Sequence, residues 1–227
     1  MNQRTVAIIQ ARMGSTRLPG KVMMKLGGLS LLSYIAARLR SAASLDEVVV
    51  ATTPHSRDDV IVQEATSCGL KCYRGSESDV LRRYLEAATI YKADIVVRVT
   101  ADNPFSDPRS IDRVVRRIKE GHDYAIEMNL PVGTTGEALT FQALDFIDTA
   151  ATTARWREHV TLYAKENSKM LRCSFEDAPS ECSRPDLSYT IDTMDEYLKI
   201  KDLCEHIPNP HFPLQELIAL ADKPAVV

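Results

Sequence analysis

The sequence lacks several features that would place it in common protein classes. No apolar run in its 227 residues approaches the roughly 20 residues that a membrane-spanning helix needs, and the run at residues 6–9 is too short for a signal peptide. The five cysteines are scattered and form no CxxC pair, so neither a zinc site nor a disulfide framework is indicated. A net charge of −3 argues against a broad nucleic-acid or membrane surface. We therefore expect a reduced, cytoplasmic protein without nucleic-acid or membrane partners.

Short apolar runs instead alternate with amphipathic segments along the chain. Strands are predicted for residues 6–10, 48–53, 71–75, 94–100, 123–128, 169–175 and 187–192. Helices are predicted for residues 29–43, 58–68, 78–93, 106–121, about 140–152, 154–167, 194–205 and 212–221. Because several strands are near-continuous valine and isoleucine runs, we expect a mostly parallel sheet with helices on both faces. The length predicts one α/β domain, in which about 129–185 is a candidate inserted lobe for an acceptor or a dimer contact.

The loop after the first strand is rich in glycine and cations. In IIQARMGSTRLPGK, residues 8–21, Gly14 and Gly20 flank five residues, whereas the Walker loop has four between its glycines. Valine rather than serine or threonine follows Lys21, and the dinucleotide fingerprint GxGxxG is absent. The spacing therefore excludes both common phosphate cradles.

The charges of this loop nevertheless predict an anion site. Arg12, Arg17 and Lys21 place three cations within ten residues, with no acid among them. Arginine offers a planar fork to phosphate oxygens and lysine offers a point charge. Open α/β sheets bind ligands at the carboxyl ends of their strands, where this loop begins. The alternative is a solvated basic loop that precedes a helix.

The loop also resembles the signature of the sugar-activating cytidylyltransferases, which include the 3-deoxy-manno-octulosonate and acylneuraminate enzymes. The stretches VVVATT, YRGSESDVLRRYLEAA, VVRVTADNPFSDP, PVGTTGEAL, REHVTLY and YTIDTMDEY follow in the order expected for the spore-coat polysaccharide branch. The resemblance covers nearly the whole chain. It implies a Rossmann-like, three-layer αβα nucleotidyltransferase fold, CTP as donor, Mg²⁺ as cofactor and a homodimer. It further implies transfer of CMP to an acidic sugar of surface-polysaccharide biosynthesis, or to a phosphonate or other small acid, with release of pyrophosphate.

Two aspartates are candidate metal ligands. Mg²⁺ prefers one or two carboxylates together with phosphate oxygens and waters. Asp102 ends the strand VVRVTAD, where a turn-forming role is the alternative, and by the resemblance Asp192 occupies the second metal position. Asp107 and Asp195 are better explained as residues at helix N-termini.

The remaining candidates complete the predicted site. Arg12, Lys21 and Asp102 are the predicted catalytic residues. The predicted nucleotide contacts are Gln10, Ala11, Arg12, Gly14, Ser15, Thr16, Arg17, Lys21, Thr52, Ser78, Thr100 and Ala101. For Thr52 and Ser78 a capping role is the alternative. The predicted acceptor contacts are Arg98, Glu137, Arg157 and His159.

Three of the four acceptor candidates have a structural alternative. Arg98 lies inside a buried strand, where its charge needs an acid if it does not face the cleft. Arg157 could belong to a helical Arg/Glu pair, and a lone helix histidine such as His159 is more often structural. Arg82 and Arg83 are expected in solvent on an amphipathic helix, and the alternative is that one of them faces the cleft.

Two other functions compete with nucleotidyl transfer. A glycosyltransferase of the related nucleotide-sugar fold would carry a DxD metal motif at the strand end, and TADNP supplies one aspartate only. A non-catalytic nucleotide-binding protein would not need two acids and three loop cations together. The residues do not decide whether the acceptor requires a general base.

Overall fold

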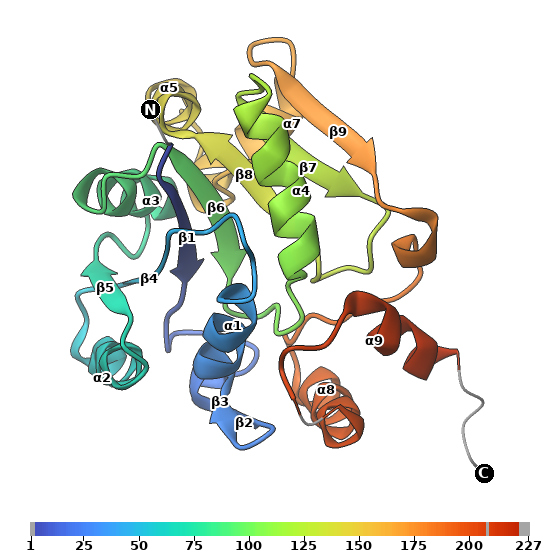
Figure 1. Ribbon diagram of the computed structural model, residues 1–227. Coiled ribbons are helices and arrows are strands. Elements are labelled where there is room, and N and C mark those ends of the chain that lie inside the picture. The colour runs from blue at the N-terminus through green and yellow to red at the C-terminus, as the bar shows by residue number, and fades with distance from the viewer. Residues whose placement is uncertain (1–2, 208, 223–227) are drawn as a thin grey trace.

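A mixed seven-stranded sheet runs through the middle of the molecule (Figure 1). The computed structural model describes residues 3–207 and 209–222. The strand order is β5-β4-β1-β6-β8-β7-β9, and β8 alone runs antiparallel to its neighbours, so the predicted mostly parallel sheet is confirmed. The strands are β1 (Thr5–Gln10), β4 (Glu47–Thr52), β5 (Lys71–Arg74), β6 (Ile95–Thr100), β7 (Tyr124–Met128), β8 (Glu137–Thr140) and β9 (Cys173–Asp177), with a separate hairpin of β2 (Lys25–Leu26) and β3 (Leu29–Ser30).

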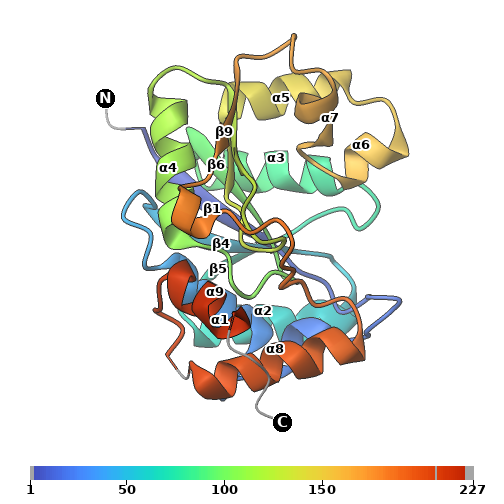
Figure 2. The same cartoon turned by 90° about the vertical axis from the view of Figure 1, so that its right-hand side faces the viewer.

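Helices cover both faces of the sheet, which Figure 2 shows from the side. One face carries α1 (Leu31–Leu39), α2 (Asp59–Ser67), α4 (Pro108–Lys119), α8 (Met194–His206) and α9 (Leu214–Ala221). The other carries α3 (Val80–Ile90), α5 (Phe141–Ala150), α6 (Ala154–Glu158) and α7 (Leu162–Glu166). Short 3₁₀ helices span Lys21–Met23, Ser56–Asp58 and Ser180–Cys182. The molecule is therefore a three-layer αβα sandwich, as expected.

The central strands are apolar on both faces because they are covered on both. Ala7 and Ile9 of β1 belong to the core beneath α1 and α4, whereas Val6 and Ile8 belong to the core beneath α3 and α5. All four side chains are fully buried. Alternation of side chains along a strand distributes one continuous apolar run between the two cores.

The point where the chain reverses direction across the sheet lies between β1 and β6. From β1 the chain continues outward to β4 and β5, and then returns to β6 on the opposite side of β1. Gln10 and Thr100 are paired at the ends of the two strands, so the loops that follow begin side by side and then diverge. Such a switch point leaves a crevice at the carboxyl edge of a parallel sheet.

Residues 129–185 add strands to the main sheet, and the sequence predictions fail at two places connected with this segment. Strand β8 was not expected, because residues 131–137 have the composition of a loop. Its register comes from β6 and β7 on either side, with Arg98 opposite Glu137, rather than from a local pattern. The strand predicted for 187–192 is wrong, since only Ser188 forms a bridge, to Val132. Its apolar alternation reflects the burial of Tyr189 and Ile191 against the core.

Several helix boundaries also differ from those predicted. The helix expected over 154–167 is broken, because α6 ends at Glu158, His159 has a non-helical conformation, and α7 begins at Leu162. The N-cap of α3 is Asp79 rather than Ser78, and its carboxylate accepts a hydrogen bond from the Arg82 N–H. Arg83, expected in solvent, is only 2% exposed and donates to the carbonyl of Ser76.

Candidate active site

A cleft of about 770 Å³ opens at the carboxyl ends of β1 and β6. The loop after β1 forms one wall, the loop after β6 forms the floor, and residues near 132, 158 and 190 complete the rim. Its lining residues are Gln10, Ala11, Arg12, Ser15, Thr16, Arg17, Lys21, Val22, Arg98, Thr100, Ala101, Asp102, Asn103, Val132, Glu158, His159, Thr190 and Asp192. The cleft therefore coincides with the crevice that the strand order predicts.

Lys21 is the point at which three distant segments meet in this cleft. Its ammonium nitrogen donates to the carbonyl of Ile191 at 2.7 Å and to Oδ1 of Asp192 at 3.0 Å. Oδ2 of Asp102 lies 3.4 Å away on the other side. The lysine side chain is 11% exposed, whereas the two carboxylates are about one-third exposed and open to the cleft. The structure thus places a shielded cation between two accessible acids.

Local backbone interactions hold Asp192 at this position. The Ile191 N–H donates to the carbonyl of Asp102, which ties the extended segment 187–192 to the loop after β6. Thr193 then caps α8, and the carboxylate of Glu196 accepts from the N–H groups of Asp192 and Thr193. This capping box fixes the chain immediately after Asp192.

The loop after β1 is folded back on itself beside these acids. The Met13 carbonyl accepts hydrogen bonds from Ser15 and from Gly20, whose φ of 71° turns the chain into Lys21. The Met13 N–H donates to Asp58, which anchors the loop to the segment after β4. In the described part of the chain, the N–H groups of Gly14, Thr16 and Arg17 have no acceptor. The loop therefore holds spare donors together with its cations.

The two loop arginines point to different acids. Arg17 lies 2.9 Å from Oδ2 of Asp192 and remains largely exposed. Arg12 is 3.7 Å from Glu77 and 4.0 Å from Glu158, so both of its contacts are loose. Exposed ion pairs of this kind are weak and easily exchanged. Both guanidinium groups are thus free to turn toward a bound anion.

The structure brings most of the predicted site residues to the cleft. Among the nucleotide candidates, three do not line it: Gly14, Thr52 and Ser78. Gly14 is covered by Arg57, whose Nη2 would lie 3.0 Å from an added Cβ atom. Thr52 is fully buried at the end of β4, so its side chain cannot reach a ligand in the cleft.

The four acceptor candidates divide evenly. Arg98 and His159 line the cleft, whereas Glu137 and Arg157 do not. Arg157 is held by Asp79 at 2.6 Å and by Asp148 at 2.7 Å, which joins α6 to α3 and α5. Its contacts are those of a structural residue.

Several lining residues were not predicted. They include Val22, Asn103, Val132, Glu158 and Thr190. Asn103 follows Asp102 directly in TADNP, and its position after the strand was a usable signal. The segments of Val132 and Thr190 are joined at the bridge between Val132 and Ser188, which no local pattern reveals.

Three buried polar atoms on the cleft floor have no hydrogen-bond partner among the described residues. They are Oε1 of Gln10, Oδ1 of Asn103 and Nε of Arg98. Buried polar groups are nearly always paired, and exceptions gather where a ligand or water supplies the partner. The floor therefore has the polar groups of a binding surface.

The carboxylates of the cleft suit a magnesium ion that arrives with phosphates. No group of three or more histidine, cysteine, aspartate or glutamate side chains that could hold a metal occurs in residues 3–207 and 209–222. Mg²⁺ in nucleotide sites is bound by one or two carboxylates, with the remaining positions filled by phosphate oxygens and water. Asp102 and Asp192 provide this donor set.

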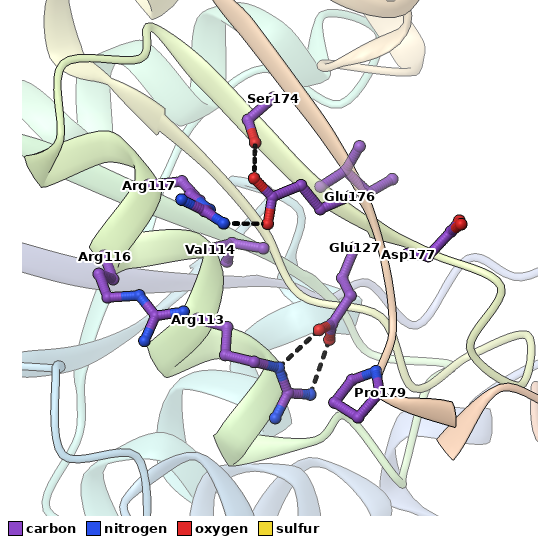
Figure 3. Close-up of a pocket in the computed structure, with 10 residues that line it drawn as sticks. Arg113, Val114, Arg116, Arg117, Glu127, Ser174, Glu176, Asp177 and Pro179 are labelled. Atoms are coloured by element: carbon purple, nitrogen blue, oxygen red, sulfur yellow. Dashed lines mark hydrogen bonds and ion pairs between the residues drawn. The ribbon is translucent and has the colours of Figure 1, made fainter. Parts of the chain in front are cut away.

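A smaller pocket of about 190 Å³ lies between α4 and strands β7 and β9 (Figure 3). Two pairs of its charged side chains point toward one another, and in the first pair Arg113 donates to both carboxylate oxygens of Glu127, at 2.5 and 2.8 Å. Arg117 is paired with Glu176 across the same pocket. These arginines already have partners, so this pocket is a poorer match for a triphosphate than the cleft at β1 and β6.

The fold and the cleft together define a nucleotidyltransferase of the α/β type. The chain belongs to the cytidylyltransferase family, whose model matches residues 6–223. The spore coat polysaccharide biosynthesis protein SpsF of Bacillus subtilis is 36% identical over 223 residues, which cover 95% of this chain and 93% of SpsF. The protein is therefore an enzyme of the nucleotidyltransferase class.

Solved structures agree with this assignment. A cytidylyltransferase from Leptospira borgpetersenii has a TM-score of 0.90 and 30% identity, over 96% of this chain and 93% of its own. A CMP:2-keto-3-deoxy-manno-octonic acid synthetase solved with CTP has a TM-score of 0.69 and 17% identity, over 90% of this chain and 99% of its own. The latter similarity concerns the fold. Among the described residues, no helix has the length and apolar character needed to span a membrane.

Proposed function

We propose that the protein transfers CMP from CTP to an acidic sugar, with release of pyrophosphate and with Mg²⁺ as cofactor. The observation that carries this proposal is the meeting of Lys21, Asp102 and Asp192 in one cleft. The relatives support the choice of donor and acceptor, because a structural neighbour was solved with CTP and is named for an acidic sugar. SpsF is named for polysaccharide biosynthesis, which supports a building block of a surface polysaccharide.

In this proposal the loop after β1 binds the triphosphate. The spare N–H groups of Thr16 and Arg17, which line the cleft, approach phosphate oxygens, as N–H groups of glycine-rich turns do. Arg12 and Arg17 leave their loose ion pairs for the phosphates, to which they present planar forks. The binding energy thus comes from donors that have weak partners or none in the free protein.

The carboxylates would hold the metal, and Lys21 would stabilise the leaving group. Asp102 and Asp192 would bind Mg²⁺, which when bound neutralises phosphate charge and orients the α-phosphate. Lys21 then contacts phosphate oxygens instead of the two acids. Negative charge grows on pyrophosphate as it leaves, and a fixed ammonium group beside it lowers the barrier.

The transfer itself is a single displacement at the α-phosphorus. An acceptor oxygen forms a bond to this atom while the bond to the bridging oxygen breaks. The electron pair of the broken bond leaves with pyrophosphate, and a hydroxyl acceptor loses its proton to water or to a base in the cleft. The residues of the cleft act mainly by holding the reactants in line.

Pyrophosphate release measures this function directly. Purified protein and Mg²⁺ are mixed with each of the four ribonucleoside triphosphates, with and without a panel of sugar acids and alkylphosphonates. We expect release that requires both CTP and one acceptor. Absence of pyrophosphate release, together with turnover of a nucleotide sugar supplied in a parallel reaction, would instead indicate a glycosyltransferase. Tight CTP binding without release under any condition would indicate a nucleotide-binding protein.

A further inference from the structure

The carboxylates of Asp102 and Asp192 are held in the free protein by cations that the proposed reaction draws away. Within residues 3–207 and 209–222, the Asp102 carboxylate contacts Lys21 alone, and the Asp192 carboxylate contacts Lys21 and Arg17. In the proposed function both cations turn to phosphate oxygens when CTP binds. The positions of the two carboxylates then depend on the backbone of the segments that carry them.

Two buried aromatic rings join these two segments. Phe105 lies three residues after Asp102, and Tyr189 lies three residues before Asp192. The ring centroids are 5.7 Å apart and the ring planes are inclined at 74°, the edge-to-face geometry that aromatic pairs prefer. The Ile191 N–H also donates to the Asp102 carbonyl at 2.8 Å. A ring contact and a hydrogen bond thus connect the loop after β6 with segment 187–192.

Phe105 is the centre of a larger aromatic cluster. Its ring centroid lies 6.1 Å from that of Tyr34 on α1 and 5.6 Å from that of Phe212, and both contacts are edge-to-face. Phe105 is 1% exposed and Tyr189 is 4% exposed, so a ligand in the cleft touches neither ring. Protein interiors are close-packed, so a ring enclosed by three others has little freedom to move.

The chain that precedes α9 supports this cluster. Arg38 of α1 is fully buried and donates to the carbonyl of Ser106 at 3.3 Å and to that of Pro210 at 2.5 Å. Its Cζ atom lies 4.0 Å from the centroid of the Phe212 ring, a cation–π contact. One guanidinium group therefore ties the loop after β6 to residues 210–212.

We propose that Phe105 and Tyr189 are positioning residues, which fix the separation of Asp102 and Asp192 and thereby set the affinity of the cleft for Mg²⁺. This inference rests on the proposed function, which assigns the two carboxylates to the metal. Mg²⁺ requires near-octahedral coordination with oxygens at about 2.0–2.1 Å, so a small displacement of one carboxylate weakens its binding. The two rings act only through the backbone and contact neither substrate nor metal.

Direct metal binding tests this role without turnover. Mn²⁺, which suits the same oxygen ligands as Mg²⁺, is titrated into CTP bound to excess protein, with no acceptor present. The relaxation rate of water protons distinguishes Mn²⁺ bound to the protein from Mn²⁺ bound to CTP alone. We expect Phe105→Leu and Tyr189→Leu each to raise the Kd of Mn²⁺ by roughly 10-fold, as loss of a residue that orients metal ligands does. The Kd of CTP in EDTA should change by less than about threefold, because its proposed donors lie on the loop after β1.

Competition with Mn²⁺ adds a readout of metal selectivity. Ca²⁺ accepts longer and more variable ligand distances than Mg²⁺. Tyr189→Leu should therefore weaken the binding of Mg²⁺ more than that of Ca²⁺. Loss of folded protein would instead lower the amount of both metals bound by the same factor.

Two control variants separate positioning from packing. Tyr163→Leu removes a buried ring with edge contacts to Phe146 and Trp156, in the core on the opposite face of the sheet. We expect it to lower stability in urea denaturation and to leave the Kd of Mn²⁺ unchanged. Tyr189→Phe keeps the ring contact and loses only the 3.4 Å hydrogen bond to the Leu217 carbonyl, so its Kd of Mn²⁺ should match that of wild type.

The possible outcomes are distinguishable. A wild-type Kd of Mn²⁺ in folded Phe105→Leu and Tyr189→Leu, or an equal rise in Tyr163→Leu, would overturn the inference and leave cytidylyl transfer standing. If either variant does not fold, Phe212→Leu takes its place, since it shortens a ring outside both segments and should raise the Kd in the same direction. The expected shifts without CTP-dependent pyrophosphate release for any acceptor would contradict the proposed function alone.

Discussion

Lys21 and Asp192 are 171 residues apart in the sequence, yet Nζ of Lys21 lies 3.0 Å from Oδ1 of Asp192. The contact links the first loop of the sheet to the segment before α8. On its other side the same ammonium group faces Asp102, so the electrostatics of the cleft are centred on one lysine. An anion that binds to Lys21 must therefore compete with the carboxylates of Asp102 and Asp192 for its ammonium group.

Replacing this lysine tests the proposed stabilisation of the leaving group. We expect Lys21→Met to lower kcat by about 10²–10³-fold, the usual effect of removing one preorganised donor. Lys25→Met is the matched control, because Lys25 is exposed on β2 and does not line the cleft. Steady-state pyrophosphate release measures both, and circular dichroism verifies folding. A Lys21→Met enzyme within a few-fold of wild type would remove this residue from the mechanism.

The assignment of Asp192 as a metal ligand is tested by replacing this residue, the partner of Lys21. Asp192→Asn should lose at least about 10²-fold in kcat and need more Mg²⁺ for half-maximal rate, because an amide is a weaker magnesium ligand. Asp195→Asn provides a comparison three residues away, on the exposed first turn of α8. We expect its Mg²⁺ titration to overlay that of wild type. Identical titrations for both variants would argue against Asp192 as a ligand.

The sequence predicted the residues of the cleft better than it predicted the strands of the second half of the chain. Lys21 could be selected as one of the three cations of the loop after β1, Asp102 as the acid at the end of an apolar run, and Asp192 from the family resemblance. Asn103 could have been added to the predicted site, because it follows Asp102 directly after the same apolar run. Strand β8 could not be predicted from the sequence. Residues 137–140 form a strand because β6 and β7 pair with them on either side. Segment 187–192 has the alternating pattern of a strand because its side chains are alternately buried and at least partly exposed. Its backbone, however, forms hydrogen bonds to loop residues 102 and 132 and not to a strand of the sheet.

The ion-pair partners of the side chains could not be predicted from the sequence either. Arg157 seemed as suitable as Arg98 for an acidic acceptor, because Arg157 lies in the family-like stretch REHVT and Arg98 is a charge inside a buried strand. Their difference is that Arg157 meets Asp79 and Asp148, whereas Arg98 meets one acid at a longer distance. Such pairings depend on how α3, α5 and α6 pack, which pattern and propensity do not specify.

This difference leads to a prediction for Arg157. Arg157→Met should lower stability, on the order of 1–3 kcal/mol, since Asp79 and Asp148 lose their shared partner. Its KM for the acceptor should stay within about twofold of wild type, because the side chain lies outside the cleft. Urea denaturation and steady-state kinetics give the two values. A large rise in acceptor KM at unchanged stability would restore Arg157 as an acceptor contact.

Glu137 should make folding stability sensitive to acid. Burial acts to raise the pKa of Glu137, but Arg98 and Lys165 outweigh it, so the pKa is lowered from the usual value of 4.5. A carboxyl group with a lowered pKa in the folded state stabilises the protein above its unfolded pKa. That stability is lost as pH falls through the folded pKa. Glu137→Gln should therefore be less stable than wild type at pH 7, on the order of 3 kcal/mol.

The pH profile distinguishes this effect from simple loss of packing. The difference between wild type and Glu137→Gln should shrink as the pH is lowered below about 4.5. Glu205→Gln, an exposed carboxylate on α8, should follow the wild-type curve throughout. Denaturant titrations at a series of pH values provide the free energies of unfolding. A difference that is independent of pH would show that charge at Glu137 does not matter.

The central claim is that the cleft directs an acceptor hydroxyl to the α-phosphorus of CTP. The most direct measurement follows the label of [α-³²P]CTP in the presence of Mg²⁺ and a sugar acid. We predict that the label appears in a new CMP-linked sugar, with one unlabelled pyrophosphate released for each molecule formed. Label that remains in CTP, or that appears only as free CMP or CDP, would contradict the claim.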